Sequence, residues 1–146
     1  QHVHVFPVIR DAVTDFIQER SPNAWIRTLT TPPNNSTELL KQRLLSHMSQ
    51  SLSEQIARKE LKTNAFFQGF RNYNRPQRAP ESFNKWFDRS PDGTLIMCHP
   101  GMISRDLSDP IRKSRHEEFD YLLSPNFLQH LFHADATLSI PDGHGF

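Results

Sequence analysis

Two histidines close to the start of the chain have the spacing of a strand-borne binding site. The segment "HVHVFP" alternates, so a strand near 2–6 would place His2 and His4 on one face and Val3 and Val5 on the other. Two imidazoles on one face of a strand are suited to binding a metal or a substrate. The alternative is a pair of structural histidines on a half-exposed edge strand, and the spacing leaves both interpretations open.

A third histidine stands at the end of an apolar stretch. In "TLIMCHPG", alternation places Met97 and His99 on one face of a strand near 94–99 and Cys98 on the other. Active sites of α/β folds collect at the carboxyl ends of parallel strands, so His99 is a candidate catalytic residue. A histidine that satisfies a loop carbonyl is the alternative. We expect Cys98 to face the helices as a small core residue rather than to act as a nucleophile.

Two further groups of side chains carry less information. The basic loop over 71–78 could line a groove for a sugar or a phosphate, but a solvated loop explains it as simply. Arg115 and Glu118 are three residues apart on an expected helix, and we interpret them as a pair on its surface. A metal-storage role for His2 and His4 lacks a second ligand pair at a suitable spacing.

The elements that would position these residues alternate along the chain. Strands are expected near 2–6, 25–29, 64–68 and 94–99, with one more at 136–140. Helices are expected over 7–20, 36–61 and 111–123, and after Pro80 and Pro125. The long helix carries an apolar residue at every fourth position, namely Leu40, Leu44, Met48, Leu52 and Ile56. This order predicts an α/β fold in which helices cover a parallel sheet, and it leaves closed barrel and open sheet undecided.

Composition and charge exclude some classes of protein. The chain has 146 residues, the size of one domain, with 17 basic and 16 acidic side chains and no long run of like charge. We therefore expect neither a nucleic-acid partner nor a membrane partner. The single cysteine excludes an internal disulfide framework, and neither a membrane span nor a signal peptide is visible. A soluble protein of the cytoplasm is the resulting expectation.

Taken together, these motifs resemble the YdjC-like carbohydrate deacetylases, the family that includes chitooligosaccharide deacetylase and the hopanoid-biosynthesis-associated proteins. "QHVHVFP" is similar to the second half of the family's D-G/S-H-Q/H-H-V-H-x-x-P segment, and Met97–Pro100 match its M-C/A-H-P motif. The family's R-x-x-E/D-L-x-x-L-x-S motif is matched by Arg115, Glu118, Leu122 and Ser124, with Phe119 in the Leu position. The resemblance covers residues 1 to about 140.

The resemblance implies part of a (β/α) TIM-like barrel, with residues 1–146 as the C-terminal half of a YdjC-like deacetylase domain. The family holds a divalent metal, Mg or Zn, with an Asp and two His from segments that would all precede Gln1, so no metal ligand is expected in this chain. The resemblance makes His99 the catalytic residue, as a proton donor or as a partner of the transition state. His2, His4 and Arg27 would bind substrate, Arg27 because "WIRT" stands where the family has an arginine-bearing strand. Asn64 stands where many relatives have Asp, and no role is transferred to it.

The function implied by the resemblance is the metal-dependent hydrolysis of N-acetyl groups from amino sugars. The substrate would be a small carbohydrate, and a homo-oligomer is left open. The chain by itself is expected to be inactive, because the metal ligands would lie upstream. The rival interpretation is a non-catalytic remnant that acts as a binding or interaction module. The sequence immediately upstream of Gln1 would separate the two, because an enzyme should show Asp-Gly-His or Asp-Ser-His there.

Overall fold

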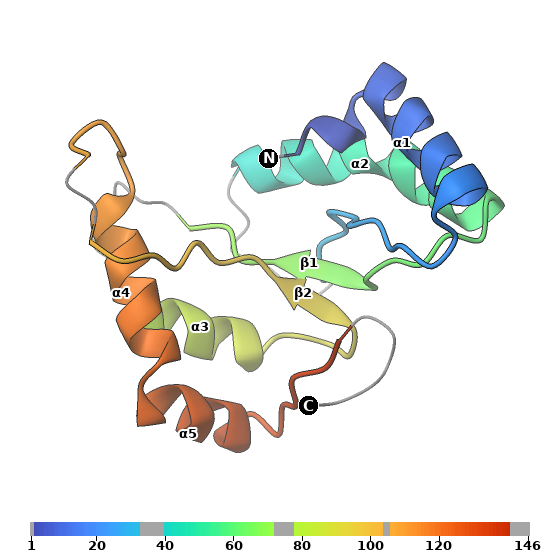
Figure 1. Ribbon diagram of the computed structural model, residues 1–146. Coiled ribbons are helices and arrows are strands. Elements are labelled where there is room, and N and C mark those ends of the chain that lie inside the picture. The colour runs from blue at the N-terminus through green and yellow to red at the C-terminus, as the bar shows by residue number, and fades with distance from the viewer. Residues whose placement is uncertain (1, 33–39, 72–77, 104–105, 141–146) are drawn as a thin grey trace.

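The computed structural model describes residues 2–32, 40–71, 78–103 and 106–140, with only the backbone given for 40–46 (Figure 1). The chain begins with a short 3-10 helix, η1 (Val3–Val5), and the helix α1 (Pro7–Arg20). The helix α2 (Leu40–Arg58) leads to the strand β1 (Phe66–Gln68). Then follow α3 (Ala79–Phe87), β2 (Thr94–Ile96), α4 (Arg112–Leu122) and α5 (Pro125–His133). This is a mixed α/β fold, as the alternating pattern predicts.

The sheet is short and parallel. β1 pairs with β2 in the register Phe66 to Thr94, Phe67 to Leu95 and Gln68 to Ile96. The pairing continues beyond the strands, because the Met97 N–H donates to the Gln68 carbonyl at 2.9 Å. The expected strands at 64–68 and 94–99 are therefore confirmed in shortened form, and their parallel pairing is confirmed.

The segment expected as a strand at 25–29 runs beside the start of the sheet without forming a full strand. Trp25 makes an isolated parallel bridge to Lys62, and the Ile26 N–H donates to the Lys62 carbonyl at 2.9 Å. Further along, the Phe67 N–H donates to the Thr30 carbonyl at 2.7 Å. The described residues 136–140, also expected as a strand, form none.

The strand expected near 2–6 is wrong, because these residues form η1. The Val5 N–H donates to the His2 carbonyl at 3.2 Å and the Phe6 N–H to the Val3 carbonyl at 3.1 Å, which closes a helical turn just before Pro7 begins α1. A strand would turn Val3 and Val5 to the same side. Here Val5 is buried and Val3 is 54% exposed.

The helices agree more closely with the pattern. α1 and α4 occupy the expected 7–20 and 111–123 within a residue, and Pro7, Pro80 and Pro125 stand in the first turns of α1, α3 and α5. α2 ends at Arg58, and the beginning of the expected helix at 36–39 lies outside the described residues. Of its apolar series, Leu52 and Ile56 are buried and Met48 is half-buried, whereas the side chains of Leu40 and Leu44 are outside the description.

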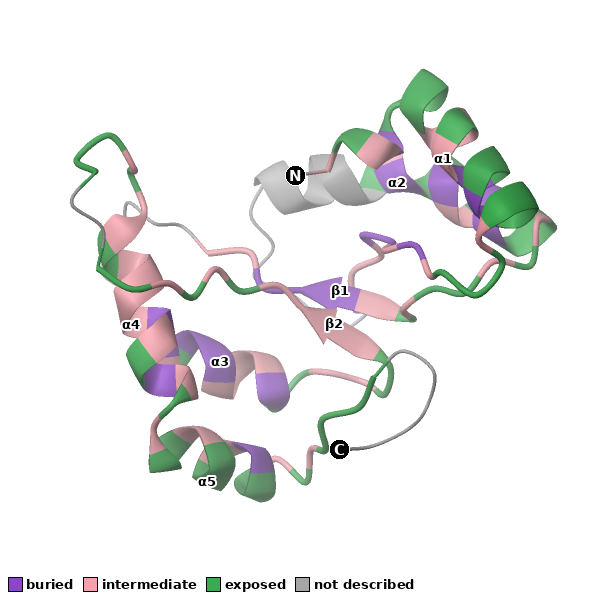
Figure 2. Cartoon of the chain, in the orientation of Figure 1, coloured by how far each residue is buried: buried purple, intermediate pink, exposed green. Residues whose placement is uncertain are grey.

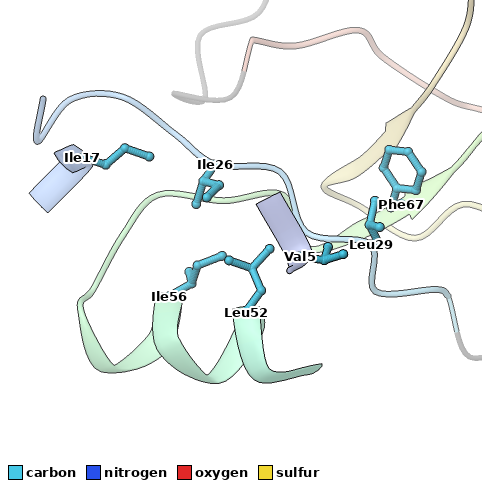
Figure 3. Close-up of a cluster of buried hydrophobic side chains, with 7 residues drawn as sticks. All are labelled: Val5, Ile17, Ile26, Leu29, Leu52, Ile56 and Phe67. Atoms are coloured by element: carbon cyan, nitrogen blue, oxygen red, sulfur yellow. The ribbon is translucent and has the colours of Figure 1, made fainter. Parts of the chain in front are cut away.

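Two cores lie on opposite sides of the sheet, with α1 and α2 on one side and α3, α4 and α5 on the other (Figure 1). The first core, drawn in Figure 3, consists of Val5, Ile17, Ile26, Leu29, Leu52, Ile56 and Phe67. The second consists of Ala79, Phe83, Phe87, Tyr121 and Leu131. β2 contributes to both, because Leu95 packs against the first and Ile96 against the second. Figure 2 shows the corresponding buried positions along β1 and within the helices, with exposed positions on their outer faces.

Within the described ranges, no helix combines the length and the apolar character needed to cross a membrane.

Candidate functional site

Arg27 joins the two N-terminal histidines. Its guanidinium donates from one terminal nitrogen to His2 Nδ1 at 3.3 Å, and its backbone carbonyl lies 2.9 Å from His4 Nε2. Arg27 itself is placed by its neighbours, because Ile26, Thr28 and Leu29 are buried and fix the backbone on either side. The structure thus brings together the three residues that the resemblance assigned to substrate binding, although His2 and His4 reach this place from a helical turn and not from a strand.

Aromatic rings of β1 and of the residues after it support this cluster. The guanidinium carbon of Arg27 lies 5.3 Å from the centre of the Phe67 ring, a cation–π geometry. The His2 ring is 5.9 Å from Phe67 and 6.0 Å from Phe70, and these two phenylalanines meet edge to face at 5.4 Å. The cluster therefore rests on the carboxyl end of β1, where active sites of parallel sheets collect.

His99 follows β2 and is held by α4 through its backbone. The His99 N–H donates to Glu118 Oε2 at 2.5 Å, and a terminal nitrogen of Arg115 lies 3.5 Å from the His99 carbonyl oxygen. Two residues later, the Gly101 N–H donates to the Arg115 carbonyl at 3.0 Å. The chain leaving β2 is thereby fixed to α4 at three points around the candidate catalytic histidine.

The electrostatic surroundings favour neutral imidazoles at both His4 and His99. Burial lowers the pKa of His99; the nearby charge of Glu118 opposes this change, and the positive charges of Arg115 and Arg27 add to it. Burial also lowers the pKa of His4, against the effect of its bond to the Arg27 carbonyl. Arg27, which bonds to His2, is thus also one of the charges that act on the pKa of His99.

Cys98 is not the core residue that the alternation predicted. The residue is exposed, although partial burial of the thiol raises its pKa. The negative charge of Glu118 raises that pKa further. The strand pairing ends at Met97, and Cys98 lies beyond it in an exposed position. A raised pKa disfavours the reactive thiolate.

The interpretation of Arg115 and Glu118 as a helix-surface pair is wrong. Glu118 is buried, with its side chain 1% exposed, and pairs with Arg71 at 2.8 Å, whereas Arg115 pairs with Asp109 at 2.8 Å. A signal was present in the sequence, because Glu118 lies three residues before the buried Tyr121 and so shares the inner face of α4. A carboxylate on that face requires a partner, which the sequence does not identify.

The basic loop at 71–78 is described only at its ends. Arg71 is bound to the carboxylates of Glu117 and Glu118 and its side chain is 4% exposed, so it faces the interior rather than an open groove. Residues 72–77, which include Arg75, lie outside the described part of the chain.

The side chains present do not by themselves fit a metal ion. Among the residues that the structure describes, no group of three or more His, Cys, Asp and Glu side chains could hold one. The rings of His2 and His4 have their centres 6.5 Å apart, and one nitrogen of each is bonded to Arg27. The imidazole and guanidinium groups present here can form hydrogen bonds with a polar ligand.

A comparison with protein-family models agrees with the resemblance read from the motifs. The model described as "YdjC-like protein" matches residues 1–132. The chain belongs to this family, and membership implies a function related to carbohydrate deacetylation, in a family that generally uses a divalent metal. Comparisons with curated proteins and with solved structures returned no match.

Proposed function

We propose that the chain forms part of a carbohydrate deacetylase that hydrolyses N-acetyl groups of amino sugars. The observation that carries this proposal is the position of Arg27, whose guanidinium bonds to His2 and whose backbone carbonyl bonds to His4. Burial lowers the pKa of His99, and the positive charge of Arg27 adds to that effect. Segments far apart in the sequence thereby supply hydrogen-bonding groups for a sugar and an imidazole for proton transfer. Family membership gives the class of reaction.

The chemistry assigned to His99 is proton transfer. Hydrolysis of the amide places the hydroxyl of water on the acetyl carbon, breaks the carbon–nitrogen bond and requires a proton on the departing amine. A neutral imidazole can take up a proton and pass it to that nitrogen. Because burial lowers the pKa of His99, the imidazole gives up such a proton readily. His2, His4 and Arg27 would hold the sugar in place, and no step is assigned to a metal because the described residues do not form its site.

We further propose that the metal ligands come from a segment that family members carry before the part matching this chain. The proposal rests on the resemblance, in which Asp and His ligands precede the "HVHVFP" motif. Residues 1–146 would then be the C-terminal half of a barrel whose other half completes the site. Mg or Zn as the metal, a small sugar as the partner, a cytoplasmic location and the oligomeric state remain predictions.

The proposal is tested by measuring acetate release from N-acetylated chitooligosaccharides. The 146-residue chain is assayed alone and after mixing with the N-terminal half of a family member, in both cases with added divalent metal. We expect turnover in the mixture and none from the chain alone. His99→Ala should lower turnover by about a hundredfold or more, since general acid–base groups contribute that much. His47→Ala is the matched control, because His47 is an exposed histidine on α2.

Two results would contradict this function. Robust turnover by the chain alone would show that the catalytic groups were placed wrongly. Full activity of His99→Ala in an active mixture would remove the role proposed for that residue. The rival function, a non-catalytic binding module, predicts that oligosaccharides bind while no mixture releases acetate.

A further inference from the structure

Glu118 connects a buried ion pair to the backbone of the candidate catalytic histidine. One carboxylate oxygen, Oε1, accepts from the Arg71 guanidinium at 2.8 Å, and the other, Oε2, accepts from the His99 N–H at 2.5 Å. Both charged side chains are removed from water, with exposed fractions of 4% for Arg71 and 1% for Glu118. Arg71 lies after β1, Glu118 lies on α4 and His99 lies after β2, so the contact joins three segments of the chain.

The charge of Arg71 alone does not explain why Glu118 is buried. Glu117, its neighbour on α4, also binds Arg71, at 3.1 Å, and that carboxylate is 36% exposed. Burying a second carboxylate is costly unless both of its oxygens are satisfied. The second oxygen of Glu118 is satisfied by the N–H of His99, and a bond to a charged acceptor is stronger than a neutral one.

We propose that Glu118 is the positioning residue of His99, anchored by Arg71, and this inference rests on the proposed function. Its carboxylate fixes the peptide that carries the imidazole, while Arg115 and Gly101 hold the chain on the far side of that residue. Its negative charge also stabilises the imidazolium that forms when His99 takes up a proton. The positive charges of Arg115 and Arg27 act in the opposite direction.

The proposal is tested by following the His99 ring signals in an NMR pH titration of the 146-residue chain. Glu118→Gln removes the charge but keeps an oxygen that can accept the backbone bond. We expect the proton affinity of the His99 imidazole to fall by about threefold or more, since a nearby opposite charge favours the charged form. The matched control is Glu117→Gln, which should produce a clearly smaller change because Glu117 contacts Arg71 rather than His99. Equal changes in the two variants, or none in Glu118→Gln, would overturn the proposal.

A second measurement needs no variant and decides the question if Glu118→Gln does not fold. In the unaltered chain, the His99 amide proton should resonate far downfield and resist exchange with solvent, because it donates to the buried Glu118 carboxylate. An amide that resonates in the ordinary range and exchanges like an exposed one would overturn the proposal. In an active mixture, Glu118→Gln should lower kcat at least tenfold with KM within about twofold. If the unaltered mixture releases no acetate, the proposed function fails while the NMR results still decide whether Glu118 positions His99.

Discussion

Gly69 and Met97 approach each other so closely that no side chain fits between them. A Cβ atom at position 69 would lie 2.2 Å from the Met97 carbonyl oxygen and 2.6 Å from its nitrogen. Gly69 also has a φ of +102°, a conformation that other residues rarely adopt. This contact sets the path of the chain between the end of β2 and His99, so it determines where the candidate catalytic residue lies.

Replacing Gly69 by alanine should therefore destabilise the fold strongly. We expect Gly69→Ala to lower the free energy of unfolding by about 3 kcal/mol or more, because backbone strain and a clash with rigid backbone act together. Urea denaturation measures the change. Gly101→Ala is the matched control, since its Cβ would meet Arg115 side-chain atoms at an ordinary 3.6 Å. A loss below about 1 kcal/mol for Gly69→Ala would contradict the described contact.

The side chain of Asn64 joins the segment after Trp25 to β1. Its Oδ1 accepts from the Thr28 N–H at 2.9 Å, and its Nδ2 donates to the carbonyls of Thr28 at 3.3 Å and Phe66 at 2.7 Å. Asn64→Ala should lower the free energy of unfolding by about 2 kcal/mol, because polar backbone groups lose their partners.

Asn64→Asp should cost more than Asn64→Ala at neutral pH, since a carboxylate would face two carbonyl oxygens. Those oxygens favour the protonated acid and would raise the pKa of the new carboxyl above its unfolded value. The penalty should therefore be small below the unfolded pKa of about 4 and grow as the pH rises through the folded one. Unfolding curves of both variants at several pH values measure this. An equal, pH-independent loss in the two variants would show that the amide does not donate these bonds.

Tyr121 provides a pH prediction for the second core. Burial raises the pKa of Tyr121 to about 12, and its hydroxyl lies 2.8 Å from His130 Nδ1. A raised pKa means that the folded state favours the protonated phenol. The stability that it contributes should be complete below the unfolded pKa of about 10 and be lost as the pH rises towards 12.

Absorbance of the tyrosinate ion measures this titration. The chain has two tyrosines, so Tyr73→Phe isolates the signal of Tyr121. We expect a single transition near pH 12 in that variant. A transition near the ordinary value of about 10 would show that the phenol is in contact with water.

The sequence predicts local structure best where a residue pattern is compatible with only one kind of secondary structure. Pro7, followed by apolar residues spaced for one helix face, predicts α1, and the apolar run before His99 predicts β2 and its parallel pairing. The start of the chain is different, because "HVHVF" satisfies strand alternation and a helical turn equally well. Packing of Val5 against Leu52 and Phe67 in the first core accompanies the helical turn, and those partners are distant in the sequence.

In the candidate site, too, some features could be predicted from the sequence and others depend on contacts between distant residues. Its residues could be named from motifs, and the structure groups His2 and His4 around Arg27, whereas their role in substrate binding stays a prediction. The spacing from Tyr121 indicates that Glu118 lies on the inner face of α4, but its partner could not be predicted, because Arg71 is 47 residues away. Long-range pairing of charges is a property of the folded chain.

A ligand titration followed by NMR tests whether the N-terminal segment and the end of β2 form one carbohydrate site. Adding di-N-acetylchitobiose to the chain should shift the ring signals of His2, His4 and His99 along a single binding curve. His133, an exposed residue at the end of α5, is the internal control and should not move. An unchanged His99 signal while His2 and His4 shift, or shifts of equal size at His133, would contradict the claim.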